Sequence, residues 1–141
     1  MGKVLGVDYG SRYIGLAISS EDRKYAFARE RIEKATRDQA IEKIAEYCRQ
    51  EEAEGLVIGL PLDQNGQIGE AAAKVKEFGR QLSEVCHLPI FYEDERFTSV
   101  MVRNLSHEAH KKEKDFRQNI DQQAAQIILQ TYLDRNHGKI S

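Results

Sequence analysis

Apolar and polar positions alternate along the chain in two different rhythms, which divide it into short strands and longer helices. Apolar, β-branched runs of roughly four to eight residues, bounded by turn residues, predict strands. Three such runs come first and two follow later. The predicted strands are Lys3–Tyr9, Ile14–Ser19, Tyr25–Ile32, Leu56–Leu60 and Pro89–Glu93.

The predicted strands differ in character, and this indicates where each lies in a sheet. The first two form a hairpin through Gly10 and Ser11. Tyr25–Ile32 is rich in arginine, which is typical of an edge strand. Leu56–Leu60 is apolar on both faces and is followed by a proline, as expected of a buried parallel strand.

Apolar residues that recur every three or four positions predict helices. Thr36 and Gln39 have the form of a capping box, and Gly55 is expected to stop the helix that follows. Thr98 could cap a short helix, and the polar stretch 107–118 predicts a mobile loop. The apolar stripes are Ile41, Ile44, Ala45 and Cys48 in the first helix, Ala71, Val75, Phe78, Leu82 and Val85 in the second, and Ala125, Ile128 and Tyr132, behind Asp121, in the last.

The order of these elements predicts a single α/β domain over residues 1–141, a length that can bury a hydrophobic core. Right-handed crossovers lay the fourth and fifth strands parallel to the first. The result is a five-stranded mixed sheet of order 3-2-1-4-5 flanked by helices. This is the ribonuclease H-like arrangement.

Composition adds the setting. The 21 basic and 23 acidic residues give a net charge of −2, so any nucleic-acid contact must be local. Cys48 and Cys86 have no metal-site spacing and are interpreted as small buried residues in a reducing compartment, which favours the cytoplasm. No apolar run approaches the roughly 20 residues of a membrane span, and no secretory leader is recognised.

Acidic residues coincide with the ends of the parallel strands. Asp8 ends the first strand and Asp94 and Glu95 follow the last, so both groups are expected at one edge of the sheet, where functional groups gather in such folds. Their backbones would stand about two strand spacings apart, near 10 Å. Glu95 is favoured over Asp94 as the partner of Asp8 because its longer side chain spans this gap better.

Asp121 is the third acidic candidate. It is expected to head the last helix, where Ala124 and Ala125 allow a close approach to the sheet. Three converging carboxylates repel one another, so divalent cations are their natural partners. Two Mg²⁺ or Mn²⁺ ions roughly 4 Å apart promote phosphodiester hydrolysis. Asp8, Glu95 and Asp121 are therefore the predicted metal ligands and catalytic residues.

Each carboxylate also has a structural interpretation when taken alone. Asp8 could accept backbone N–H bonds in a turn, Asp121 could offset a helix dipole, and Asp94 or Glu95 could pair with Arg96. Only their joint placement favours catalysis.

Several basic and aromatic residues are candidates for substrate contacts. Arg12 could hold a phosphate or be a surface residue, and Lys111 and Lys112 lie in a locally basic stretch that is equally consistent with a solvated loop. Tyr9 and Tyr13 could stack on unpaired bases or pack on the hairpin. His107 and His110 lack a third ligand and are interpreted as surface residues.

Four segments, in order and over nearly the whole chain, resemble the YqgF (RuvX-like) family of resolvases, also described as pre-16S rRNA nucleases. They are Val7–Ala17, Gly59–Leu62, Asp94–Thr98 and Ile120–Gln130. The resemblance implies divalent-metal nuclease chemistry in a cytoplasmic bacterial setting, with ribosomal RNA maturation or branched-DNA processing as the role.

Carried over to this sequence, the resemblance makes Asp8, Glu95 and Asp121 the metal ligands, and Arg96 and Thr98 their phosphate or ligand supporters. The stretch 107–117 departs from the expected basic loop because acidic residues interrupt it. Three functions remain open: a nuclease acting on RNA or branched DNA, a nucleotide-binding module, and a nonenzymatic nucleic-acid adaptor. Monomer and homodimer are both compatible with the sequence.

Overall fold

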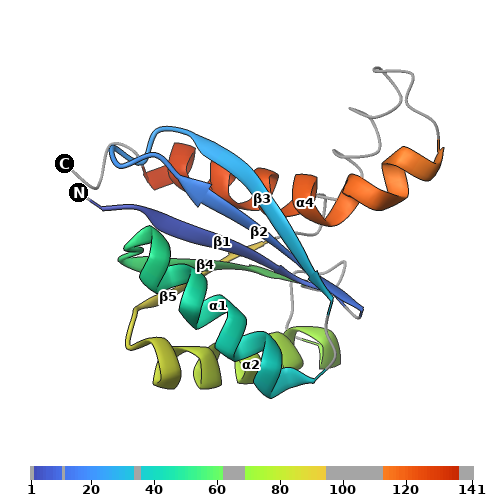
Figure 1. The fold of residues 1–141 in the computed structure, drawn as a ribbon, viewed down its shortest axis with the longest axis horizontal. Helices are drawn as coiled ribbons and strands as arrows, with labels where there is room; N and C mark the ends of the chain where they lie inside the picture. Colours follow the sequence, from blue (N-terminus) through green and yellow to red (C-terminus); the bar gives the residue numbers. More distant parts are fainter. Residues whose placement is uncertain (1, 11, 34–35, 62–68, 95–112, 137–141) are drawn as a thin grey trace.

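The computed structural model describes residues 2–10, 12–33, 36–61, 69–94 and 113–136, with side chains from Ala124 onward in the last range. Five strands and three helices lie in these ranges (Figure 1). The strands are β1 (Val4–Tyr9), β2 (Tyr13–Ser19), β3 (Ala26–Glu33), β4 (Gly55–Leu60) and β5 (Ile90–Asp94). The helices are α1 (Arg37–Glu51), α2 (Glu70–Cys86) and α4 (Glu113–Asn136).

The sheet has the predicted order, β3-β2-β1-β4-β5. β1 to β3 form an antiparallel meander, whereas β4 is parallel to β1 and β5 is parallel to β4. The arginine-rich β3 lies at an edge, as expected. All six residues of β4 are buried, in agreement with its apolar pattern. The three parallel strands therefore end at one edge of the sheet.

Helices cover both faces of the sheet, with α1 and α2 on one side and α4 on the other (Figure 1). Side chains of β1 alternate between the two layers. Leu5 and Val7 belong to the core beneath α1 and α2, whereas Val4 packs in a second core with Ala125 and Leu129 of α4. No described helix is long and apolar enough to cross a bilayer.

Helix α1 begins as predicted and ends differently. The Thr36 hydroxyl accepts a hydrogen bond from the Gln39 backbone N–H at 3.1 Å, which confirms the N-cap. The helix ends at Glu51, and Glu52 adopts the left-handed conformation with φ 55°. Gly55, the expected stop, is instead the first residue of β4. The chain leaves the helix without a glycine because Glu52 N–H still bonds the Arg49 carbonyl.

The apolar stripe of α2 is shifted by one position at its start. Val75, Phe78 and Leu82 are buried as predicted, but Ala71 and Val85 are exposed. Ala72 and Gly79 take their places in the core. Gly79 is buried because Tyr92 of β5 covers it so closely that a Cβ there would lie 2.3 Å from the tyrosine oxygen.

Helix α4 is longer than its apolar stripe indicated. It begins at Glu113, so the prediction of a loop is wrong for residues 113–118, and Asp121 lies inside the helix rather than at its head. Glutamate, lysine, arginine and glutamine have high helix propensity and can extend a helix without an apolar face. Residues 107–112 and the short helix predicted after Thr98 lie outside the described residues.

The two cysteines, distant in sequence, meet between α1 and α2. Cys48 is buried in the last turn of α1, Cys86 is the half-buried last residue of α2, and both line one hollow beside the ends of the two helices. The neighbouring Cys86 thiol and burial raise the pKa of the Cys48 thiol. The interaction with Cys48 lowers the pKa of Cys86. The interpretation of Cys48 and Cys86 as separate apolar residues missed this pair.

Candidate nuclease site

Asp8 lies near the carboxyl end of β1, one residue beyond the parallel pair of Val7 with Ile58. It is half-buried. Val4 and Gly6 face α4, since Val4 packs against that helix and Gly6 contacts Leu129. Alternation along the strand places Asp8 on the same face. The first predicted ligand thus stands at the predicted edge, beneath the α4 layer.

Asp94 is the last residue of β5, not a residue beyond it, and pairs with Leu60 of β4. Its neighbour Tyr92 donates a hydrogen bond to the Lys76 carbonyl of α2 at 3.4 Å. Alternation therefore places Asp94 on the α2 face, opposite to Asp8. Glu95 lies outside the described residues, as do Arg96, Thr98, Lys111 and Lys112.

Helix α4 runs antiparallel to β1, and this sets the place of Asp121. Ala125 and Leu129 lie over Gly6. Gln130, the residue after Leu129, accepts a hydrogen bond from the Ala26 backbone N–H at 2.8 Å. Ala26 pairs with Ser19, whose hydroxyl accepts a hydrogen bond from the Val4 N–H at the start of β1. Positions before Ala125 therefore lie toward the end of β1. Asp121 precedes Ala125 by one helical turn, on the side where β1 ends.

Glu93 is a buried carboxylate that the sequence reasoning missed. It is 3% exposed, pairs with Gly59 across β4, and accepts a hydrogen bond from the Arg135 guanidinium of α4. Burial raises its pKa, while Arg135 opposes that shift and Asp94 adds to it. Alternation along β5 places Glu93 on the same face as Phe91, and the contact of Phe91 with Tyr132 of α4, which only the structure supplies, identifies that face as the α4 face.

The turn after Asp8 is tight. Gly10 N–H donates to the Tyr13 carbonyl at 3.0 Å, and a Cβ on Gly10 would lie 2.5 Å from that oxygen. Arg12 is exposed there, with its guanidinium 5.3 Å from the centre of the Tyr13 ring, which Arg31 also covers at 3.9 Å. Arg12 is thus close in sequence to Asp8 and open to solvent, as a phosphate contact requires.

The described side chains contain no group of three histidine, cysteine or acidic residues able to hold a metal ion. Of the three predicted ligands, only the side chain of Asp8 is among them; Glu95, His107, His110 and the side chain of Asp121 lie outside the described part of the chain. The metal site stays a prediction. The fold supplies the edge at which it would form.

Comparison with known proteins adds a family and a fold. Residues 2–135 match the family described as RuvX, Holliday junction resolvase. A protein of Lactiplantibacillus plantarum named "Putative pre-16S rRNA nuclease" is 39% identical, over 99% of this chain and 98% of the relative. A protein of Maridesulfovibrio salexigens with the same name is 37% identical, over 94% of this chain and 98% of the relative.

Solved structures agree on the architecture. Thermus thermophilus RuvC, in complex with a Holliday junction substrate, superposes with a TM-score of 0.61 at 14% identity, over 99% of this chain and 98% of that one. The fowlpox virus Holliday junction resolvase gives a TM-score of 0.60 at 11% identity, over 94% and 99%. These likenesses and the strand order show a ribonuclease H-like fold.

Proposed function

Because the chain belongs to the RuvX family, we propose that it is a divalent-metal-dependent endonuclease that hydrolyses phosphodiester bonds in the 5′-end maturation of pre-16S rRNA. The names of relatives at 37–39% identity over nearly the full chain support this substrate. We place this reaction in the cytoplasm, where free thiols such as Cys48 and Cys86 stay reduced.

The proposal rests on the geometry at one edge of the sheet, where the end of β1 lies beneath α4. Asp8 lies on the α4 face at the end of β1, and the antiparallel course of α4 brings the turn containing Asp121 toward that end. Glu95 is proposed as the third ligand. Its support is the place of Asp94 on the opposite face, which leaves Asp94 poorly placed to share an ion with Asp8.

Hard cations fit this donor set, since Mg²⁺ and Mn²⁺ prefer carboxylate oxygens. Two such ions would activate a water and stabilise the leaving oxygen of the cleaved phosphodiester. The protein's own contribution would be to hold Asp8, Glu95 and Asp121 in place and to orient the substrate phosphate with Arg12, Arg96, Thr98, Lys111 and Lys112.

Two other functions are kept as alternatives. The description of the family favours cleavage of Holliday junctions, and a symmetric four-way junction would suit a homodimer with two sites. A nonenzymatic nucleic-acid adaptor would need none of the three carboxylates. A single copy supplies the whole proposed set, so the rRNA reaction is compatible with a monomer.

The test is cleavage by the purified chain, with Mg²⁺ or Mn²⁺, of a pre-16S rRNA leader and of a four-way DNA junction. We expect the leader to be cut. Asp8→Asn should lower the rate by about 100-fold or more, because even residues that only support metal ligands contribute up to that factor. Glu95→Gln should do the same while leaving RNA binding intact.

Asp94→Asn is the matched control, since Asp94 neighbours Glu95 in sequence but lies on the other face of the sheet. It should reduce the rate only mildly. If Asp94→Asn lowered the cleavage rate more than Glu95→Gln, Asp94 rather than Glu95 would be the metal ligand. Cleavage of the junction alone would favour the resolvase, cleavage of neither substrate the adaptor, and equal cleavage by Asp8→Asn would reveal a contaminating nuclease.

A further inference from the structure

Strand β3 contains a β-bulge that changes the face on which its later residues lie. Ala28 pairs with Ala17 of β2, whereas Arg31 pairs with Gly15, so two residues of β3 stand opposite the one residue of β2 between these pairs. In an unbroken strand Ala28 and Arg31 would lie on opposite faces, because side chains alternate. The extra residue brings both to the same face, which is how bulges re-aim a side chain.

This face is the one that carries Asp8. Gly15 pairs with Asp8 of β1 on one side and with Arg31 of β3 on the other, so the three residues form a row across neighbouring strands. Residues directly opposite one another in a sheet share a face. Arg31 therefore lies on the α4 face together with Asp8, and their backbones stand about two strand spacings apart, near 10 Å.

Tyr13 holds two guanidinium groups at this end of the sheet. It is the first residue of β2, and because Ile14 and Leu16 belong to the core beneath α1 and α2, alternation places Tyr13 on the α4 face. The centre of its ring lies 3.9 Å from Cζ of Arg31 and 5.3 Å from Cζ of Arg12. Both distances are within the range of cation–π contacts, so one ring gathers two positive charges.

The two guanidinium groups can still bind an anion. Neither Arg12 nor Arg31 forms a side-chain hydrogen bond or an ion pair with the part of the chain that the structure describes. Glu33, which lies opposite Tyr13, is exposed and pairs with neither arginine. A guanidinium that rests on a ring keeps the N–H donors in its own plane for a phosphate. Because the two like charges repel each other, an anion that contacts both is favoured.

We propose that Arg31 and Arg12, held by Tyr13, bind a phosphate of the RNA substrate next to the one that is cleaved. The inference rests on the proposed function, which puts the cleaved phosphate at Asp8. The separation of two strand spacings assigns Arg31 to a neighbouring phosphate of the same strand. Phosphate contacts fix the position of a nucleic acid on a protein without reading its sequence, so this pair sets where the RNA strand lies relative to Asp8.

The experiment measures binding of a labelled single-stranded RNA from the pre-16S rRNA leader to the full chain, by fluorescence anisotropy in EDTA at several salt concentrations. Arg31→Gln and Arg12→Gln should each weaken binding by about tenfold and reduce the salt dependence by about one phosphate contact. Arg31→Lys should keep the salt dependence but bind about threefold more weakly, because lysine lacks the planar fork of arginine.

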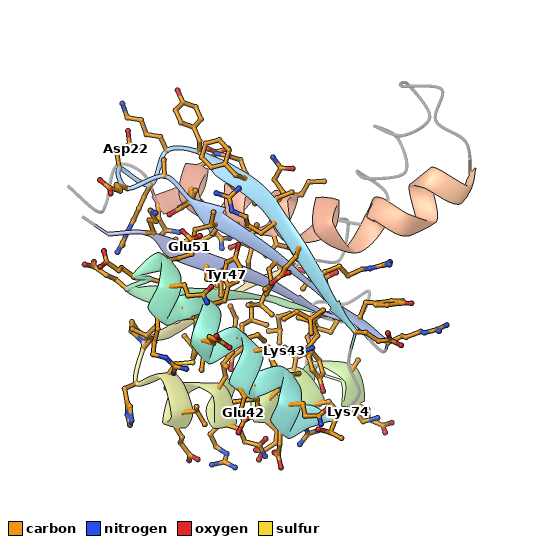
Figure 2. The ribbon with its side chains drawn as sticks, in the orientation of Figure 1. Asp22, Glu42, Lys43, Tyr47, Glu51 and Lys74 are labelled. Atoms are coloured by element: carbon orange, nitrogen blue, oxygen red, sulfur yellow. The ribbon has the colours of Figure 1, made fainter. Side chains whose placement is uncertain are left out.

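Arg29→Gln is the matched control, because Arg29 is an exposed arginine of the same strand on the other face. Burial raises the pKa of Tyr47, and Arg29 opposes that shift, so Arg29 lies toward α1, the helix on which Figure 2 labels Tyr47. Arg29→Gln should bind RNA within about twofold of the unaltered chain, since salt screens a charge that is not in contact. An equal loss in Arg29→Gln and Arg31→Gln would show an effect of net charge alone and overturn the site.

The role of the ring is tested by Tyr13→Leu, which removes the support of both guanidinium groups without changing any charge. It should weaken RNA binding by about threefold, whereas Tyr13→Phe keeps the ring and should bind as the unaltered chain does. Thermal melts of Tyr13→Leu and Arg31→Gln check that both variants are folded. Normal binding by a folded Tyr13→Leu would contradict the part assigned to the ring.

Unchanged affinity and salt dependence in Arg31→Gln would overturn the phosphate site, as would a lack of RNA binding by the unaltered chain in EDTA. Cleavage of the same RNA with Mg²⁺ separates this result from the proposed function. If Arg31→Gln binds and cleaves normally while Asp8→Asn is inactive, the phosphate site is wrong and the nuclease is retained. If Asp8→Asn cleaves normally, or the unaltered chain does not cleave, while Arg31→Gln still loses binding, the nuclease is wrong and the arginine pair is retained as an RNA contact.

Discussion

Gly6 lies where α4 crosses β1, and it has no room for a side chain. A Cβ there would lie 2.8 Å from the Leu129 Cβ and 3.2 Å from the Ala125 carbonyl oxygen. Because both contacts belong to a packed helix, Gly6→Ala should push α4 away from the sheet. We expect the free energy of unfolding to fall by about 1–3 kcal/mol in urea denaturation.

Gly69 provides the contrasting glycine for that measurement. It is the N-cap of α2, in extended conformation, and among the described residues there is no side-chain cap and no atom within 4 Å of an added Cβ. Gly69→Ser should therefore leave stability unchanged or raise it by about a few tenths of a kcal/mol. A Gly6→Ala variant as stable as Gly69→Ser would show that α4 is not held closely against β1.

Glu93 makes the free energy of unfolding depend on pH, and the direction of its pKa shift gives the sign of that dependence. Its pKa is raised chiefly by burial, so its contribution to stability is present below the unfolded-state pKa of about 4.5 and is lost as the pH rises through the folded-state pKa. Relative to Glu93→Gln, the unaltered chain should gain unfolding free energy as the pH falls from neutrality toward that range. Urea unfolding of both proteins across this range measures the difference in unfolding free energy, taken as the unaltered chain minus the variant. A difference that stays constant or becomes more negative as the pH falls would contradict the prediction.

At the scale of elements, the thiol pair ties α1 to α2. The Cys86 thiolate, favoured by its lowered pKa, should attack hydrogen peroxide to give a sulfenic acid and a hydroxide ion, and the Cys48 thiol should then displace water from the sulfenic acid to form a disulfide. Mass spectrometry should show the loss of two hydrogens, reversed by dithiothreitol. Cys86→Ser should prevent it. Oxidation of separate chains into a linked dimer instead would contradict the pairing seen between α1 and α2.

Elements with a strong local signal were predictable from the sequence, and those set by tertiary contacts were not. The Thr36 cap and the buried β4 follow from residues adjacent in the chain. The burial of Gly79 depends on Tyr92, which reaches it from another element, and no periodicity reveals that. The start of α4 at Glu113 was missed because its first turns carry charge without an apolar stripe.

At the scale of the whole molecule, the strand order could be predicted because handed crossovers leave few alternatives. The same rule predicted that Asp8 and the end of β5 lie at the same edge of the sheet. Assigning faces needed the structure, since the side of Asp94 depends on contacts of Tyr92 with α2 and of Glu93 with α4. The face of Asp94 supports Glu95 as the ligand more strongly than side-chain length does, although Glu95 itself stays a prediction.

The charged edge strand has a consequence for self-association. β3 exposes Arg29 and Glu30 along a border of the sheet, and the opposite border, β5, has only five residues. Edges with charged side chains or few residues discourage a neighbouring molecule from adding its own strand and starting an aggregate. If two copies pair on a symmetric substrate, they should meet through helices or loops, which keeps the sheet of each copy separate.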